Sequence, residues 1–297
     1  MYDRFAFGQD GHFFCKKEGE NLNQNWIVEN LNNAFSTWNG KLGELWGLVT
    51  TGPQTFKGGA VWSVMQTLHN GMVGIGYALV VLFFAISLCK NTMNFHELKR
   101  PEAAIHYFLR FVAAKTLVGY GMDIMLNIFS ICNGIVTDMA NSMGGISEAM
   151  VSLPAEMQTA IENVGFLASI PLWLVTILGS LFITVLSFVM ILTVYGRFFR
   201  LYMYTALAPL PLAAFAGEST QSVGISFLKS YVGVCLEGAV IVLACVIYSA
   251  FVSTPTVASG EATTIVWSYL AETVFNMLVL VGLIKGSDRI IHEMMGL

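Results

Sequence analysis

The sequence predicts an all-α, polytopic membrane protein with five transmembrane helices, and three observations support this prediction. Hydrophobic residues fill 55% of the 297 positions and charged residues only 11%, whereas a soluble domain carries about 25% charged residues. The mean hydropathy is +0.66. Two runs long enough to cross a bilayer, 61–89 and 164–196, contain no Asp, Glu, Lys or Arg. Such a chain cannot cover a water-facing surface, so we expect it to be embedded in lipid.

Residues 1–60 differ from the rest and are expected to form an extracytoplasmic, amphipathic N-terminal segment. The apolar positions within 21–50 recur at steps of three and four, the spacing of one helix face, and the opposite face is rich in asparagine. Gly52 and Pro53 then give a stop signal. The apolar face could lie on the bilayer or against the protein's own core, or it could bind a partner or a second copy. This face comprises Ile27, Leu31, Phe35, Trp38, Leu42, Leu45 and Val49.

Residues 61–297 are expected to form the transmembrane helical bundle, because each span needs about 20 apolar residues. The third span is longer than a hydrocarbon core of about 30 Å requires, so it should tilt or protrude. A short amphipathic helix at 146–164 should lie flat on the outer surface. The predicted spans are 61–89, 103–137, 164–196, 230–252 and 265–284.

The segment 201–216 is apolar, but Pro209 and Pro211 interrupt it. Neither proline can donate a backbone hydrogen bond, and each restricts the residue before it. A break at membrane depth is tolerated only where protein or water covers it. We therefore expect a re-entrant or interfacial hairpin here, and a sixth full span is the alternative.

The distribution of basic residues predicts the orientation, because positive charge marks the cytoplasmic side. The loops at 138–163 and 253–264 hold no Lys or Arg and are placed outside, and the C-terminal residues 285–297 are placed inside. With a re-entrant 201–216, every loop obeys the rule, the N-terminus lies outside and the C-terminus lies in the cytoplasm. The expected cytoplasmic basic anchors are Lys90, Lys99, Arg100, Arg197 and Arg200.

The motifs of common enzyme classes are absent from the sequence. There is no P-loop, no HExxH, no GxSxG and no GxGxxG before a helix. The five cysteines have no CxxC spacing and are expected to be small buried hydrophobic residues. We therefore expect no enzymatic activity, no cofactor and no metal ion.

Five ionisable residues fall inside the predicted spans, where each costs about 2.5–3.5 kcal/mol at a helix centre. They should pair, snorkel or line a polar interior. Arg110 lies close to the inner boundary, where snorkelling is the simpler interpretation. Glu237 and Glu272 are candidates for interhelical pairs with Lys115, for lining a conduit or for proton coupling. The five residues are Arg110, Lys115, Asp123, Glu237 and Glu272.

Three stretches invite comparison with a known family: WNGKLGELWGLVTTGPQTFKGGAVWSVM at 38–65, LKRPEAAIHYFLRFVAAKTLVGYG at 98–121 and YGRFFRLYMYTALAPLPLAAF at 195–215. In these stretches the chain resembles the TrbL-like polytopic inner-membrane subunits of type IV secretion and conjugation systems, in the form found on conjugative elements of Firmicutes. Together with the hydropathy pattern, the resemblance covers most of the chain.

The resemblance implies a subunit of an inner-membrane translocation channel, assembled as a homo-oligomer. The implied neighbours are a membrane-associated ATPase, small bitopic subunits and a coupling ATPase, and the substrate would be single-stranded DNA with its covalently attached relaxase. A DNA path should be positively lined or neutral, so Arg110 and Lys115 are candidate lining residues. The alternatives are an ion-coupled small-molecule transporter that uses Glu237 and Glu272, and a purely structural scaffold.

Overall fold

Every secondary-structure element in the part of the chain that the structure describes is a helix. The computed structural model describes residues 18–92, 101–142, 150–164, 166–251 and 262–296. Within these ranges, four helices are long and apolar enough to cross a membrane: α2, α6, α8 and α9. The elements are α1 (Glu18–Thr50), η1 (Phe56–Gly59), α2 (Ala60–Thr92), α3 (Pro101–Gly119), α4 (Gly121–Ser142), α5 (Ala155–Glu162), α6 (Phe166–Leu207), α7 (Pro209–Ala213), η3 (Ala214–Ala216), α8 (Gln221–Phe251) and α9 (Ala262–Met295), where η marks a 3-10 helix.

The helices form two compact units, and α1, α6 and α9 contribute residues to both. The predicted division near residue 60 separates an extracytoplasmic segment from the transmembrane bundle. It stays a prediction. The first unit comprises Met1–Asn39, Val151–Val185 and Thr254–Asn276, and the second comprises Gly40–Met150, Leu186–Ser253 and Met277–Leu297.

In the first unit, α1 lies beside α6. The rings of Trp26 and Trp173 have their centroids 5.8 Å apart, and the side-chain amide of Asn30 donates to Ser180 Oγ at 3.1 Å. The apolar positions on this part of α1 are buried, so their helical spacing marks a packed face. These positions are Ile27, Leu31, Phe35 and Trp38, each at most 2% exposed.

The segment before α5 is not helical, which corrects the predicted amphipathic helix at 146–164. Pro154 stands at the N-cap of α5 with an extended backbone, because a proline ring removes the N–H that a preceding turn would need. The chain at Val151 is held by the side-chain amide of Asn39, which donates to Val151 O at 2.8 Å and accepts from Val151 N at 3.0 Å. Only Ala155–Glu162 forms the helix, and residues 146–149 lie outside the described residues.

The part of α1 in the second unit also packs against its own chain. Glu44 accepts hydrogen bonds from Lys41 Nζ and from the hydroxyl of Tyr195 on α6, both at 2.6 Å. These bonds hold the pKa of the Glu44 carboxyl below its usual value, although partial burial opposes them. Leu42, Leu45 and Val49 are fully buried. The apolar face of α1 is therefore buried within the chain. Its role as an oligomer or partner face stays a prediction.

In the second unit, α2 and the chain from α6 to η3 run side by side in the same direction. Residues further along α2 contact residues further along α6 and α7, through ring stacking, hydrogen bonds and close packing. The successive contacts are Phe56–Phe198, Trp62–Tyr202, His69–Thr205, Gly76–Pro209 and Ser87–Glu218.

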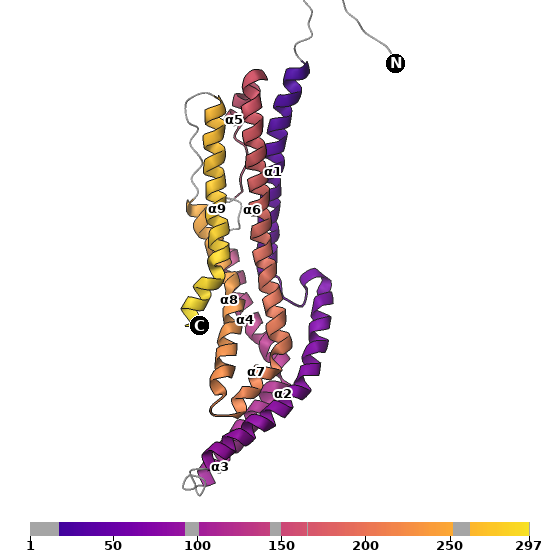
Figure 1. Ribbon diagram of the computed structural model, residues 1–297, viewed down its shortest axis with the longest axis vertical. Coiled ribbons are helices and arrows are strands. Elements are labelled where there is room, and N and C mark those ends of the chain that lie inside the picture. Colours follow the sequence, from indigo (N-terminus) through magenta and orange to yellow (C-terminus); the bar gives the residue numbers. More distant parts are fainter. Residues whose placement is uncertain (1–17, 93–100, 143–149, 165, 252–261, 297) are drawn as a thin grey trace, which may run out of the picture. The chain divides into compact units, whose positions relative to one another are not determined.

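This order of contacts does not confirm the predicted re-entrant hairpin at 201–216. The chain does not turn back at the prolines but continues along α2, first as α6 to Leu207 and then as α7 and η3. It turns only after Ala216, before α8 begins (Figure 1). The physical reason is that protein covers the break: Leu212 and Ala213 are fully buried among α2, α3 and α8.

The predicted span at 103–137 consists of two helices, and neither belongs to the four spanning candidates. α3 ends at Gly119 and α4 begins at Gly121. The backbone hydrogen bonds from Tyr120 N to Thr116 O and from Ile124 N to Tyr120 O persist at the junction. The junction is therefore a local kink between two short helices and not a loop.

A glycine permits the close approach of α2 to α7. A Cβ at Gly76 would lie 2.9 Å from Val118 Cγ1 and 3.0 Å from Pro209 Cβ, whereas nothing lies within 4 Å of the corresponding point at Gly74. We expect Gly76→Ala to lower the thermal unfolding midpoint of the detergent-purified protein, because overpacking costs about 1–3 kcal/mol. Gly74→Ala is the matched control and should not lower the midpoint, because alanine favours a helix over glycine and nothing lies close to its Cβ. Equal midpoints for the two variants would contradict this contact.

Candidate functional site

Arg197 on α6 is completely buried and reaches two other helices. Its guanidinium donates to the backbone carbonyls of Val234 and Cys235 on α8, at 3.2 and 3.1 Å, and to that of Val49 on α1, at 3.4 Å. A Cβ at Gly238 would lie 2.8 Å from both terminal nitrogens. The missing side chain at Gly238 therefore leaves the space that the guanidinium fills.

The hydrogen bond to Val49 belongs to a complete cap of α1. The last four carbonyls of a helix have no partner within it, and a buried helix end needs other donors. A cation at this end also interacts favourably with the helix dipole. The donors are Thr51 Oγ1 for Gly47 O (2.7 Å), Thr51 N for Leu48 O (3.1 Å), Arg197 Nη1 for Val49 O (3.4 Å) and Asn133 Nδ2 for Thr50 O (3.2 Å).

Arg200, one turn further along α6, binds two carboxylates. Its Nη2 lies 2.7 Å from both oxygens of Glu237 on α8, and its Nη1 donates to Asp288 on α9. The hydroxyl of Ser287 donates to Glu237 Oε1 at 3.2 Å. Glu237 is only 1% exposed. With Arg197, the two arginines and two carboxylates have a formal charge of zero.

We call Arg197, Arg200, Glu237 and Asp288 the charge cluster. It ties α6 to α8, α9 and the end of α1. The charged atoms of Arg197, Arg200 and Glu237 bind partners within the chain, so the cluster is suited to fixing helices. Among the described residues, no group of three or more His, Cys, Asp or Glu side chains is placed to hold a metal ion.

The charge cluster changes the roles predicted for three residues. Glu237 is paired, as one interpretation expected, but its partner is Arg200 and not Lys115. Arg197 and Arg200 were expected to be basic anchors in a loop, yet they lie within the continuous helix α6. Their expected role as cytoplasmic anchors stays a prediction.

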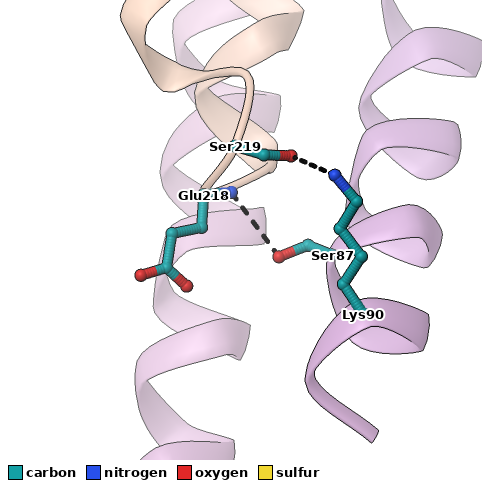
Figure 2. A pocket seen from close by; sticks show the side chains of 4 residues that line it. All are labelled: Ser87, Lys90, Glu218 and Ser219. Atoms are coloured by element: carbon teal, nitrogen blue, oxygen red, sulfur yellow. Dashed lines mark hydrogen bonds between the residues drawn. The ribbon is translucent and has the colours of Figure 1, made fainter. Parts of the chain in front are cut away.

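Lys90 and Arg110, two other residues for which the sequence predicted a role, contact polar groups near the start of α8. Lys90 Nζ lies 3.4 Å from Ser219 Oγ, and Arg110 donates to Gln221 Oε1 at 3.4 Å and lies 3.9 Å from a carboxylate oxygen of Glu218. Ser87, Lys90, Glu218 and Ser219 line a pocket of about 230 Å³, in which the Glu218 carboxylate points away from Lys90 (Figure 2). Arg110 therefore contacts polar groups of the protein itself.

The remaining predicted residues are not brought together. Lys115 on α3 and Asp123 on α4 are exposed in the second unit, and Glu272 is half-buried in the first. None of the three has an ion-pair partner among the described residues. Lys99 and Arg100 lie outside the described residues. The conduit and pairing roles of these residues stay predictions.

Sequence reasoning missed His69, which repairs the proline break. Pro209 has no N–H, so the carbonyl of Thr205, four residues earlier, lacks its helical donor. The Nδ1 atom of His69 lies 2.7 Å from that carbonyl oxygen, and the ring is 1% exposed. Since a carbonyl only accepts, Nδ1 carries the proton. A single histidine in the charge-free run 61–89 was the available signal.

These features define a class of protein: a polytopic helical membrane protein whose helices are locked by buried polar contacts. The family model described as TrbL/VirB6 plasmid conjugal transfer like protein matches residues 38–209, more than half of the chain. The chain therefore belongs to this TrbL/VirB6-like family. The match includes His69, Arg197 and Arg200 and ends at Pro209. No curated protein and no solved structure matches the chain.

The pair between Arg200 and Glu237 should stabilise the fold. Removing one charge of a buried pair costs about 3–5 kcal/mol, and because the Arg200 side chain is 27% exposed, water should reduce that cost. We expect Glu237→Gln to lower the thermal unfolding midpoint clearly. The double variant Arg200→Met/Glu237→Leu should recover part of the loss, because it keeps the cluster formally neutral and Asp288, whose side chain is 44% exposed, can be hydrated.

The matched control for this pair is Arg289→Gln. Arg289 and Glu293 form an ion pair in which the side chains are 86% and 65% exposed. Exposed pairs contribute little, about 0–1 kcal/mol, so the control midpoint should stay close to that of the unmodified protein. A double variant less stable than Glu237→Gln would show that the charges are not paired.

The contact of His69 with the proline break can be tested by a double-mutant cycle. His69→Leu leaves the Thr205 carbonyl buried without a donor, at a cost of about 1–3 kcal/mol. Pro209→Ala restores a backbone N–H that can take over. We expect His69→Leu to lower the thermal unfolding midpoint less in the Pro209→Ala background. Additive losses would mean that His69 does not serve the carbonyl freed by the proline.

Proposed function

We propose that this protein is a membrane channel or scaffold subunit of a conjugative type IV secretion system, which helps to move single-stranded DNA with its attached relaxase across the cytoplasmic membrane. The observation that carries this proposal is the family match over residues 38–209, because the family is one of plasmid conjugal transfer. The four helices able to cross a membrane fit a multi-pass component of that apparatus.

The proposed role is to form the membrane part of the path, without chemistry of its own. Energy would come from partners, namely a membrane-associated ATPase and a coupling ATPase. The chain would act as a homo-oligomer, and the DNA path would run between copies. Lys115, which is exposed on α3, is the better candidate to face that path, because Arg110 is shared with Glu218 and Gln221.

We also propose five membrane crossings, with the N-terminus outside and the C-terminus in the cytoplasm. The crossings are α2, α3 with α4, α6 with α7 and η3, α8, and α9. Two observations support them. The run from α6 to η3 ends beside the end of α2, at Ser219 and Lys90. α9 runs opposite to α8, since Ser287 contacts Glu237 and Ile291 lies against Gly233.

This assignment keeps the orientation expected from charge without a re-entrant hairpin. The segments 164–196 and 201–216 count as one crossing, so the number of crossings stays odd. The end that carries Lys90 and Arg110 would face the cytoplasm. α6 has 42 residues, or about 63 Å, twice the hydrocarbon thickness of about 30 Å, so part of this crossing lies outside the lipid.

The proposed function predicts a specific defect in donor cells. Deleting the gene should abolish transfer of the conjugative element, while nicking of its DNA by the relaxase continues, because the membrane component acts after DNA processing. Mating frequency and nicking assays measure the two steps. Expression of the intact protein or of the Arg289→Gln control should restore transfer. Unchanged transfer in the deletion strain would refute the proposal.

A further inference from the structure

Helix α4 has three different faces. One face is buried and packs within the second unit, mainly against α8. At 3.6 residues per turn, the two other faces are separated clearly by residue type. The buried face consists of Gly121, Met125, Phe129, Cys132, Val136 and Ala140.

The second face of α4 carries polar residues along the whole helix, interrupted by one glycine. Its six residues fall within about 80° of the helix circumference at 3.6 residues per turn. All six are exposed, and the two carboxylates have no ion-pair partner among the residues described. The polar face consists of Asp123, Asn127, Ser130, Gly134, Asp138 and Asn141.

The third face of α4 consists of isoleucines and lies between the other two. Ile131 is 69% exposed and Ile135 is 47% exposed, whereas Ile128 is half-buried and packs against the buried cluster of the second unit. Isoleucine side chains are suited to lipid, whereas an aspartate in the hydrocarbon costs about 2.5–3.5 kcal/mol. The isoleucine face consists of Ile124, Ile128, Ile131 and Ile135.

The middle of α4 lies beside the middle of a spanning helix. The hydroxyl of Tyr231 on α8 donates to Met125 O at 2.8 Å, and Cys132 shares a buried cluster with Cys235. α8 has 31 residues, or about 46 Å, against a hydrocarbon core of about 30 Å. Whichever stretch of α8 lies in the hydrocarbon, it therefore includes the midpoint of α8. Ser130, on the adjacent part of α4, then lies at membrane depth.

We propose that the polar face of α4 lines a water-filled crevice at membrane depth, while the isoleucine face contacts lipid. Water can hydrate both carboxylates, whereas a protein partner would need a base opposite each of them. Because both charged groups are acidic, the crevice accepts water and cations and repels DNA phosphates.

Thiol labelling of neighbouring positions tests the crevice. The parent is the full chain with Cys15→Ser and Cys89→Ser, because Cys132, Cys235 and Cys245 are buried. In membrane vesicles, a charged, membrane-impermeant thiosulfonate should label Ser130→Cys at least about ten times faster than Ile131→Cys, because hydrocarbon excludes charged groups. Asn127→Cys and Ile135→Cys form a second pair with the same expected order.

Each other outcome overturns the proposal. If all four positions are labelled equally, α4 lies outside the membrane, and if none is labelled, lipid or protein covers the polar face. A second measurement tests the negative charge of the crevice. Asn127→Cys should react faster with a cationic than with an anionic thiosulfonate. Asp123→Asn should reduce that preference. This inference goes beyond the proposed function. Thiol labelling is measured without DNA transfer, so the crevice and the proposed function can each be refuted while the other stands.

Discussion

The constraint on which the rest of the structure depends is that backbone carbonyls without a helical donor must find a donor inside the protein. Lipid supplies no hydrogen bonds, and each unsatisfied group costs several kcal/mol. The chain meets this constraint at two places with side chains from distant segments. Arg197 and Asn133 serve the end of α1, and His69 serves the carbonyl that Pro209 leaves free. These contacts fix α1, α2, α4 and α6 against one another more specifically than apolar packing can.

The arginine that closes α1 requires further polar groups around it. A buried guanidinium is costly unless it is paired, and the charge cluster supplies the compensation through Glu237 and Asp288, with Arg200 between them. The space for Arg197 comes from Gly238, next to Glu237 in sequence. Neighbouring positions on α8 therefore provide both the cavity and the counter-charge. This arrangement explains how two arginines are accommodated within α6, a helix that is long and apolar enough to cross a membrane.

Local sequence patterns predicted those structural features that depend on a single segment of the chain. The spacing from Ile27 to Val49 predicted a buried face of α1, and the absence of charge predicted α2 and the first part of α6. The path of 201–216 could not be predicted in this way, because its direction depends on the covering by α2 and α3. Likewise, nothing near Glu237 in sequence indicates Arg200, which lies on a different helix. Pro154 is the exception, since its effect on the segment before α5 is local and was readable from the sequence.

The distribution of polar groups separates the parts of the chain that hold it together from those that face outward. Arg197, Arg200, Glu237 and His69 bind partners within the chain, so these side chains hold the helices together. The exposed groups Lys115 and Asp123 lie on consecutive helices and differ in sign. A helix that borders both lipid and water needs a surface that changes from apolar to polar within a short distance. On α4 this change occurs between Ser130 and Ile131, two adjacent residues that are both exposed. The requirement is therefore met by one helix, supported from behind by α8.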